Sequence, residues 1–494
     1  MSQLKDLELL IESKYPLIAV ETEEEDRLYD MLRRIAVQMN LQFYLWTPVD
    51  GLTRPPFKDT MGPNDRQPAQ ALGQVAAGRD DGIYLFKDLH KYLDDPAVLR
   101  RVRDLVPVLA RGRRALILTA PHLSLPPEIQ AITAPFRLDL PTLDELKVLV
   151  HNTARDLAAK RAIKVDLPPE DLDRLAVALQ GLTLFEAERA LTRAIMDTMA
   201  LSRDDLEKII QVKKEIVERE GLLDFWPRTD DFATVGGLGN LKAWLERRRR
   251  AFTPEAREFG LEPPKGILLL GVQGCGKSLC AKAVAKEWGL PLLKLEPGRL
   301  YDKFIGESEK NLERALEVAA RLAPVVLWID EIEKGFAAVS QTESDAGLSK
   351  RIFGRLLAWL QDRPAPVFVA ATCNDILSLP PEMMRKGRFD EIFFVDLPNP
   401  EERRDIFAIH LKKRKRDPAA FDLPRLAEAT AGFSGAEIEQ AIVSALYDAF
   451  AAGSDLTTDL LLRQLKATRP LSVVRAEEVN ALRAWASSRT VPAS

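Results

Sequence analysis

The chain has only three cysteines in 494 residues: Cys275, Cys280 and Cys373. They are too few and too irregularly spaced for a disulfide framework or a zinc cluster, so the sequence predicts a reducing compartment. Histidine is almost as rare, with four residues and no His-Glu-x-x-His pattern. This absence excludes the zinc-protease chemistry that the pattern supports.

Long apolar runs and a strong net charge are also lacking. No run approaches the roughly 18 residues that a membrane span needs, and the opening residues, Met-Ser-Gln-Leu-Lys-Asp-Leu-Glu, contain no signal-peptide core. The 70 Lys and Arg residues nearly balance the 74 Asp and Glu residues, leaving a net charge of −4. Nothing in that balance requires nucleic acid or a membrane as partner. We expect a cytoplasmic protein, or a stromal one if it is encoded in a plastid.

Apolar runs alternate with helical patterns in two long stretches, which is typical of mainly parallel sheets covered by helices. At about 150 residues per domain, the length predicts about three domains. The expected strands lie at residues 17–20, 43–46, 83–86, 116–119 and 136–138, and then at 267–270, 292–295, 325–329, 367–371 and 392–395. A charged helical segment at 203–220 and a joint containing Pro and Asp at 225–231 separate the stretches, so we place the main boundary there.

The two stretches share short sequence matches. Three pairs of segments match in the same order: 125–128 with 379–382 (Leu-Pro-Pro-Glu), 139–141 with 396–398 (Asp-Leu-Pro), and 181–191 with 432–442. Coincidence among common turn and helix residues would explain any one match. Three in order indicate an internal duplication.

The second stretch contains a phosphate-binding loop. Gly271-Val-Gln-Gly-Cys-Gly-Lys277-Ser278 fits G-x-x-x-x-G-K-[ST] and stands between an expected strand and an expected helix. Its glycines let backbone N–H groups turn toward phosphate oxygens, and the helix presents its positive end to them. We expect Lys277 to contact the β- and γ-phosphates of ATP and Ser278 to ligate Mg²⁺. The predicted nucleotide-binding segment comprises Gly271, Val272, Gln273, Gly274, Cys275, Gly276, Lys277, Ser278 and Leu279.

Two further strands end in polar side chains. Residues 325–329 lead into Asp330 and Glu331, and a later strand leads into Asn374. Strand tips are where open α/β sheets bind their ligands. We expect Asp330 in the Mg²⁺ shell, Glu331 orienting or deprotonating the attacking water, and Asn374 bonding that water and the γ-phosphate.

These motifs, in this order, resemble the AAA domain of protein-remodelling ATPases over residues 232–475. Val235-Gly-Gly-Leu238, with Gly236, resembles the adenine-side segment of that family, and His410, Gly435 and Ala436 match family positions beside the nucleotide. The resemblance implies an α/β fold: a P-loop AAA module with helices on both faces of a parallel sheet, and a helical lid. The proposed domains are a degenerate AAA-like domain (1–140), a helical lid-like segment and linker (141–224), the large ATPase subdomain (225–398), and the lid with a C-terminal tail (399–494).

Arg385 and Arg388, in Met384-Arg-Lys-Gly-Arg-Phe-Asp390, resemble the arginine fingers of the family. A guanidinium supplied by a neighbouring subunit stabilises transition-state charge and makes hydrolysis depend on assembly. The resemblance therefore implies a homo-oligomer, with a hexameric ring favoured.

The segment Lys303-Phe304-Ile305-Gly306 resembles the pore loop of the same ATPases. In a closed ring, such aromatic residues would line a channel and grip an extended polypeptide through apolar contacts. The alternative is that Phe304 and Ile305 pack into their own domain. One departure puts the signalling between subunits in doubt, because relatives have Leu-Asp-Gly or Met-Asp-Gly where this chain has Leu360-Gln-Asp-Arg363.

The first stretch lacks the catalytic features. Where a phosphate loop is expected it reads Pro16-Leu-Ile-Ala-Val20-Glu-Thr-Glu-Glu-Glu-Asp26, and its five carboxylates, without glycine or lysine, would repel a triphosphate. The strand at 83–86 leads to a single acid, Asp88, which we match with Asp330. A degenerate module joined to one intact AAA module resembles the uncharacterised AAA proteins of cyanobacteria and algal plastids.

Three functions are compatible with these motifs. A ring that remodels or threads a protein substrate is favoured by the pore loop and the finger arginines. An ATP-gated switch or scaffold without threading is favoured by the missing Asp-Gly pair. A nucleic-acid-directed ATPase rests on basic runs at 247–250 and 412–416, which lack the aromatic residues typical of base stacking.

Overall fold

The computed structural model describes residues 3–56, 65–160, 164–165, 175–198, 200–201, 205–219, 221–226, 231–300, 307–337, 343–362, 365–385 and 387–494. The chain divides into two compact units, Met1–Leu206 and Glu207–Ser494. Among the helices in the described ranges, none combines the length and apolarity that crossing a bilayer requires.

The first unit is built on a six-stranded sheet with the order β3-β2-β4-β5-β1-β6. Its strands are β1 (Leu17–Glu21), β2 (Gln42–Thr47), β3 (Gly51–Thr53), β4 (Gly82–Lys87), β5 (Arg114–Ala120) and β6 (Ala134–Arg137). All neighbours pair in parallel except β3, which runs antiparallel to β2 at the edge. The central strands β4 and β5 are almost wholly buried, as expected when helices cover both faces.

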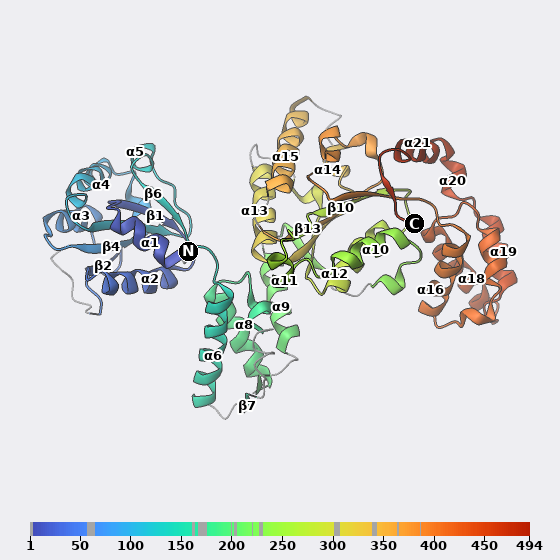
Figure 1. Ribbon diagram of the computed structural model, residues 1–494, viewed down its shortest axis with the longest axis horizontal. Helices are drawn as coiled ribbons and strands as arrows, with labels where there is room; N and C mark the ends of the chain where they lie inside the picture. The colour runs from blue at the N-terminus through green and yellow to red at the C-terminus, as the bar shows by residue number, and fades with distance from the viewer. Residues whose placement is uncertain are drawn as a thin grey trace. The chain divides into compact units, whose positions relative to one another are not determined.

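Helices cover both faces of this first sheet (Figure 1). α1 (Gln3–Glu12) and α2 (Glu25–Gln38) pack through one apolar core, and α3 (Pro68–Ala77) and α4 (Pro96–Leu109) pack through the other. The other elements of this unit are η1 (Leu89–Tyr92), α5 (Pro127–Gln130), α6 (Leu143–Lys160), β7 (Lys164–Val165), α8 (Leu184–Thr198) and β8 (Ala200–Leu201).

The second unit is built on a seven-stranded sheet with the order β15-β14-β10-β13-β12-β11-β9. Its strands are β9 (Leu223–Trp226), β10 (Gly266–Gly271), β11 (Leu292–Leu295), β12 (Val325–Ile329), β13 (Val367–Cys373), β14 (Glu391–Val395) and β15 (Val491–Pro492). β9 is an antiparallel edge strand, and the other pairings are parallel. β10, β12 and β13 are apolar and buried along their whole length, which is typical of a parallel sheet covered on both faces.

Two layers of helices and a separate helical bundle complete the second unit (Figure 1). α10 (Gly239–Arg248) and α12 (Lys277–Trp288) cover one face of the sheet, and α13 (Glu307–Arg321) and α15 (Glu343–Asp362) cover the other. The lid has its own core and consists of α16 (Pro400–Lys413), α17 (Leu423–Ala429), α18 (Gly435–Ala451) and α19 (Thr458–Ala467). The remaining elements are α9 (Asp205–Arg219), η2 (Phe232–Thr234), α11 (Pro254–Glu258), η3 (Pro297–Leu300), α14 (Lys334–Ala337), η4 (Ile376–Ser378), η5 (Pro381–Met384), η6 (Pro418–Ala420), α20 (Leu471–Val474) and α21 (Ala476–Ala486).

The two units share one strand order. Taken in chain order, the five matched strands are β1, β2, β4, β5 and β6 in the first unit and β10 to β14 in the second. In both sheets the first of these strands lies between the fourth and the fifth. The second of them pairs with an antiparallel edge strand, β3 or β9. Their helices also begin alike: reciprocal side-chain and backbone bonds join Thr142 to Glu145 before α6 as they join Asn399 to Glu402 before α16. The same capping pattern precedes α8 and α18. Topology and helix starts therefore support the predicted duplication.

All ten predicted strands are present, with ends that differ by up to two residues. The α/β class with a helical lid is confirmed. The joint expected at 225–231 begins differently, because Phe225 and Trp226 belong to the edge strand β9, whose apolar side chains pack on the core. The boundaries after residues 140, 224 and 398 remain proposals.

Candidate functional site

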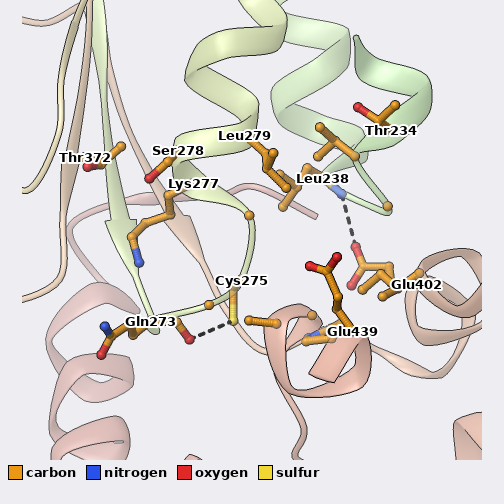
Figure 2. Close-up of a pocket in the computed structure, with 18 of the residues that line it drawn as sticks. Thr234, Leu238, Gln273, Cys275, Lys277, Ser278, Leu279, Thr372, Glu402 and Glu439 are labelled. Carbon is orange, nitrogen blue, oxygen red and sulfur yellow. Dashed lines mark hydrogen bonds between the residues drawn. The ribbon is translucent and has the colours of Figure 1, made fainter. Parts of the chain in front are cut away.

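A cavity of about 310 Å³ lies where β10, β12 and β13 end, bordered by the glycine loop and the lid. Small-molecule sites typically enclose about 300–1,000 Å³. Figure 2 shows Lys277 and Ser278 on one side of it and Glu402 and Glu439 on the other. Of the residues predicted to bind nucleotide or metal or to take part in hydrolysis, those that line it are Gly236, Gln273, Gly274, Cys275, Gly276, Lys277, Ser278, Leu279, Asp330, Glu331, Asn374, His410, Gly435 and Ala436.

The glycine loop starts at Gly271 and ends where α12 begins. A Cβ atom on Gly271 would lie 1.9 Å from the carbonyl oxygen of Val395, so only glycine fits between β10 and β14. Gly271 and Val272, which were also predicted to bind nucleotide, do not line the cavity, and their carbonyl oxygens accept hydrogen bonds from Lys277. Gly276, with φ of 89°, caps α12 in the left-handed conformation that glycine favours.

Lys277 is the buried cation of this loop. Its side chain is 6% exposed, and its ammonium group donates to the carbonyl oxygens of Gly271 and Val272, both at 2.8 Å. Burial lowers the pKa of Lys277, because the charged form loses solvation. A phosphate at this helix N-terminus would give the ammonium a charged acceptor in place of neutral carbonyls.

The two acids lie within hydrogen-bonding reach of the loop helix and of β13. Ser278 Oγ donates to Asp330 Oδ1 at 2.8 Å, and Asn374 Nδ2 donates to Glu331 Oε1 at 3.0 Å. The other carboxylate oxygen of Glu331 forms an ion pair with Lys334. Glu331 has φ of 49°, which is uncommon for a residue with a side chain.

Oxygen ligands at this position suit a hard divalent cation. The hydroxyl of Ser278 and the carboxylate of Asp330 are the ligand types that Mg²⁺ prefers. In the described part of the chain, no group of three or more His, Cys, Asp or Glu residues could hold a metal by itself. Mg²⁺ is commonly held by one or two side chains together with substrate phosphates, so this sparse set fits that ion.

The lid side of the cavity carries polar residues that the sequence did not single out. Glu402 Oε1 accepts the backbone N–H of Leu238, the last residue of the predicted adenine-side segment, at 3.2 Å. The capping pattern of Asn399 and Glu402 was the available signal for this residue. Val235 and Leu238, from the predicted adenine-side segment, also line the cavity. The cavity-lining residues that the sequence did not indicate are Thr234, Thr372, Asp396, Pro398, Glu402, Ile406, Ile409 and Glu439.

His410 lies on α16 beside two charged neighbours. Its Nδ1 is 3.3 Å from Glu439, which also pairs with Arg414 at 2.9 Å. Burial lowers the pKa of His410, and the nearby Glu439 carboxylate only partly opposes this. The imidazole is therefore neutral at neutral pH and can both donate and accept beside a base.

The predicted finger arginines are not part of the cavity of their own chain. Arg385 is exposed after η5 and Arg388 is half-buried, and neither lines the cavity of its own chain. Arg388 Nη1 is buried and has no hydrogen-bond partner in the described part of the structure. Lys303, Phe304, Ile305 and Gly306 lie outside the described residues.

The basic runs are partly neutralised by their own surroundings. In the run at 412–416, Lys413 and Arg414 pair with Glu439, and Arg416 pairs with Asp455 at 3.0 Å. In the run at 247–250, the Arg248 guanidinium lies 3.7 Å from the ring centre of Trp244. These contacts favour a structural role over binding to a phosphate backbone.

Strand register locates the corresponding place in the first unit. The comparison starts at the Asp-Leu-Pro segment that both units contain. From there, the strand partners are traced through β6, β1, β5 and β4 in the first unit and through β14, β10, β13 and β12 in the second. The matched positions are Glu21 with Leu270, Ala120 with Cys373, Thr119 with Thr372, and Lys87 with Asp330.

This register corrects our sequence alignment of Asp88. Lys87 takes the place of Asp330, and Asp88 follows with φ of 59°, close to the 49° of Glu331. The first unit has therefore lost the first acid and kept the second, the reverse of what we expected. α2 begins at Glu25 as α12 begins at Lys277, and Glu25 pairs with Lys87 at 2.9 Å. In the second unit the lysine begins the helix and the acid follows the strand, whereas in the first unit the acid, Glu25, begins the helix and the lysine, Lys87, ends the strand.

Side chains join the degenerate loop directly to the lid-like helices of the first unit. Glu24 Oε1 accepts the backbone N–H of Leu184, at the start of α8, at 2.6 Å. Arg27 donates to Glu24 at 2.9 Å, to the carbonyl oxygen of Asp139 and to Glu145 at 3.0 Å. Arg27 and Glu24 are each only 7% exposed, so this is a buried ion pair.

Arg27→Ala is expected to destabilise the first unit by about 3–5 kcal/mol, because it leaves buried Glu24 without its partner. Hydrogen exchange measured by mass spectrometry should show loss of protection in α2 and the start of α8. Arg34→Ala removes the same charge from an exposed position of α2 and should change stability by less than about 0.5 kcal/mol. Equal protection in Arg27→Ala and Arg34→Ala would contradict this role of the ion pair.

The strand order, the loop and the lid together define the class: a P-loop nucleotide-binding module of the AAA type. The family model described as "ATPase family associated with various cellular activities (AAA)" matches residues 267–397, and the AAA+ lid domain model matches 420–461. Models for the N-terminal and second domains of SpoVK-like AAA ATPases match 3–138 and 144–220. The chain belongs to the family of the AAA domain-containing protein ycf46.

Relatives match over nearly the whole chain. The "Uncharacterized AAA domain-containing protein ycf46" of Trieres chinensis is 36% identical over 487 residues, covering 98% of this chain and 96% of that protein. Its namesake in Pyropia yezoensis is 37% identical over 490 residues, covering 98% of each. The proteasome-activating nucleotidase of Aeropyrum pernix is 39% identical over 209 residues, covering 41% of this chain and 50% of that protein. The predicted resemblance is confirmed.

Proposed function

We propose that this chain is a Mg²⁺-dependent ATPase that converts ATP and water to ADP and phosphate. The observation that carries the proposal is the bonded pair of Ser278 and Asp330, which shares one cavity with Glu331 and with the buried ammonium of Lys277. Ser278 and Asp330 would hold Mg²⁺, which supplies positive charge to offset that of the phosphates.

Each polar side chain has a distinct role in this proposal. Lys277 binds phosphate oxygens, and Glu331 accepts a proton from the attacking water. Asn374, whose amide donates to Glu331, keeps that carboxylate directed toward the cavity. Gly236 and His410 lie at the side of the cavity that we assign to adenine. There, neutral His410 can donate a hydrogen bond to the adenine ring or accept one from it.

Assembly follows from the arginines. Because neither Arg385 nor Arg388 lines its own cavity, we assign them to the site of a neighbouring subunit in a homo-oligomeric, hexameric ring. Phosphate release per subunit should then rise with protein concentration as rings form. A rate that stays constant down to concentrations where light scattering finds monomers would contradict the ring.

The proposed work is the remodelling or threading of a protein substrate in the cytoplasm or the plastid stroma. Similarity of the AAA part to a proteasome-activating nucleotidase is compatible with this substrate class. The gripping residues would be Phe304 and Ile305.

Phe304→Ala is expected to abolish unfolding of a fluorescent protein that carries an unstructured tail, because the apolar grip on the chain is lost. ATP hydrolysis should remain close to that of the wild type. Phe304→Tyr keeps the aromatic ring and should keep both activities. Unfolding that survives Phe304→Ala would favour the alternative, an ATP-gated switch or scaffold without threading.

A further inference from the structure

Thr372, on β13, is bonded to both acids of the site and has no role in the proposed chemistry so far. We propose that it is a positioning residue that holds Asp330 and Glu331 in their hydrolytic arrangement. This inference rests on the proposed ATPase function and adds one residue to its site.

The Thr372 hydroxyl both donates and accepts a hydrogen bond at the site. It donates to Asp330 Oδ1 at 2.7 Å and accepts the backbone N–H of Glu331 at 2.9 Å. Thr372 is only 1% exposed, so the hydroxyl is largely shielded from water. Asp330 Oδ1 also accepts from Ser278, so one carboxylate oxygen links α12, β12 and β13. The hydroxyl therefore fixes the rotamer of the proposed metal-binding acid.

The same hydroxyl stabilises the unusual backbone of Glu331. A left-handed conformation is unfavourable for a residue with a side chain unless its surroundings stabilise it. The bond from the Glu331 N–H to Thr372 supplies part of that stabilisation. In this conformation the Glu331 carboxylate reaches Asn374 at 3.0 Å. Loss of the hydroxyl would free both the acid that holds the metal and the acid that acts on water.

The first unit shows that the strand does not need this hydroxyl in order to fold. Thr119 is the register match of Thr372 and is equally buried, at 1% exposed. Its Oγ1 has no hydrogen-bond partner among the described residues. Thr119 lacks the hydrogen bond that Thr372 makes because Lys87 occupies the position of Asp330 and pairs with Glu25. β5 forms all the same, so the threonine hydroxyl gains its partners only where the acids are present.

Thr372→Val keeps the shape of the side chain and removes the hydroxyl. Residues that hydrogen-bond to metal ligands typically contribute about 10–100-fold to activity or metal affinity, so kcat at saturating ATP and Mg²⁺ should fall by that factor. Binding of a fluorescent ATP analogue should be unchanged in EDTA, whereas its tightening by Mg²⁺ should be weakened by about tenfold. Thr372→Ser restores the hydroxyl and should restore both quantities.

Thr119→Val is the matched control, since it makes the same change at the matched position of the first unit. It should leave hydrolysis and the Mg²⁺ effect unchanged. Thermal melting of each variant checks that the fold is kept. If Thr372→Val matches the wild type, or if Thr372→Ser is damaged as much as Thr372→Val, the positioning role is wrong while the ATPase proposal stands. A wild type without Mg²⁺-dependent hydrolysis would overturn both.

Discussion

Glu331→Gln is expected to bind ATP as tightly as the wild type and to lower kcat by about 10²–10⁴-fold, the contribution typical of a general base. Glutamine has almost the same shape and can keep a contact with Asn374, but its amide does not accept a proton from water at neutral pH. Titration with a fluorescent ATP analogue measures binding, and single-turnover phosphate release measures the chemical step.

Two further variants serve as controls for this experiment. Lys277→Ala should lose nucleotide binding itself, because it removes the buried cation of the loop. Glu317→Gln neutralises an exposed acid of α13 that does not line the cavity, and it should change neither binding nor turnover. Turnover at the wild-type rate in Glu331→Gln would mean that another group activates the water.

The phosphate side of the cavity could be predicted because its determinants are local in sequence. The residues from Gly271 to Ser278 are contiguous, so a single strand, turn and helix position the whole loop. Asp330 and Asn374 follow buried strands of one parallel sheet, and such strands end at the same edge. Their proximity therefore follows from the order of the motifs alone.

The adenine side could not be predicted in the same way. Glu402 and Glu439 come from lid helices, and their approach to the loop depends on tertiary packing across separations such as the 164 residues between Leu238 and Glu402. Thr372 was missed for a related reason. A threonine inside an apolar strand has no distinguishing spacing, and its importance appears only when strand register places it beside Asp330.

The misalignment of Asp88 has a simple physical origin. A single acid after a strand can be matched with either member of an Asp-Glu pair, and sequence spacing does not decide between them. Hydrogen-bond register does decide, because each β4 residue has a fixed partner on β5. The first unit thus has the same strand pairing and backbone turn as the second, while the acid and the lysine are exchanged at the positions that correspond to Asp330 and Lys277.

Arg388→Ala is expected to lower kcat by about 10³-fold or more while leaving ATP affinity nearly unchanged, because a finger supplied in trans acts on the transition state. Mixing provides a sharper measurement than the variant alone. Arg388→Ala subunits keep an intact Glu331, and Glu331→Gln subunits keep an intact finger. If the finger serves the neighbouring site, equal mixing under conditions that allow subunit exchange should restore activity at junctions between the two.

The mixing experiment distinguishes a finger that acts on a neighbouring subunit from an arginine that acts only within its own chain. A mixture no more active than the sum of its parts would mean that Arg388 acts within its own chain or only supports the fold. Arg247→Ala, which removes an exposed arginine of α10 that does not line the cavity, is the matched control and should leave hydrolysis unchanged. Because Arg388 carries a buried nitrogen without a partner among the described residues, a phosphate oxygen from a neighbouring site would supply the bond that this guanidinium lacks within its own subunit.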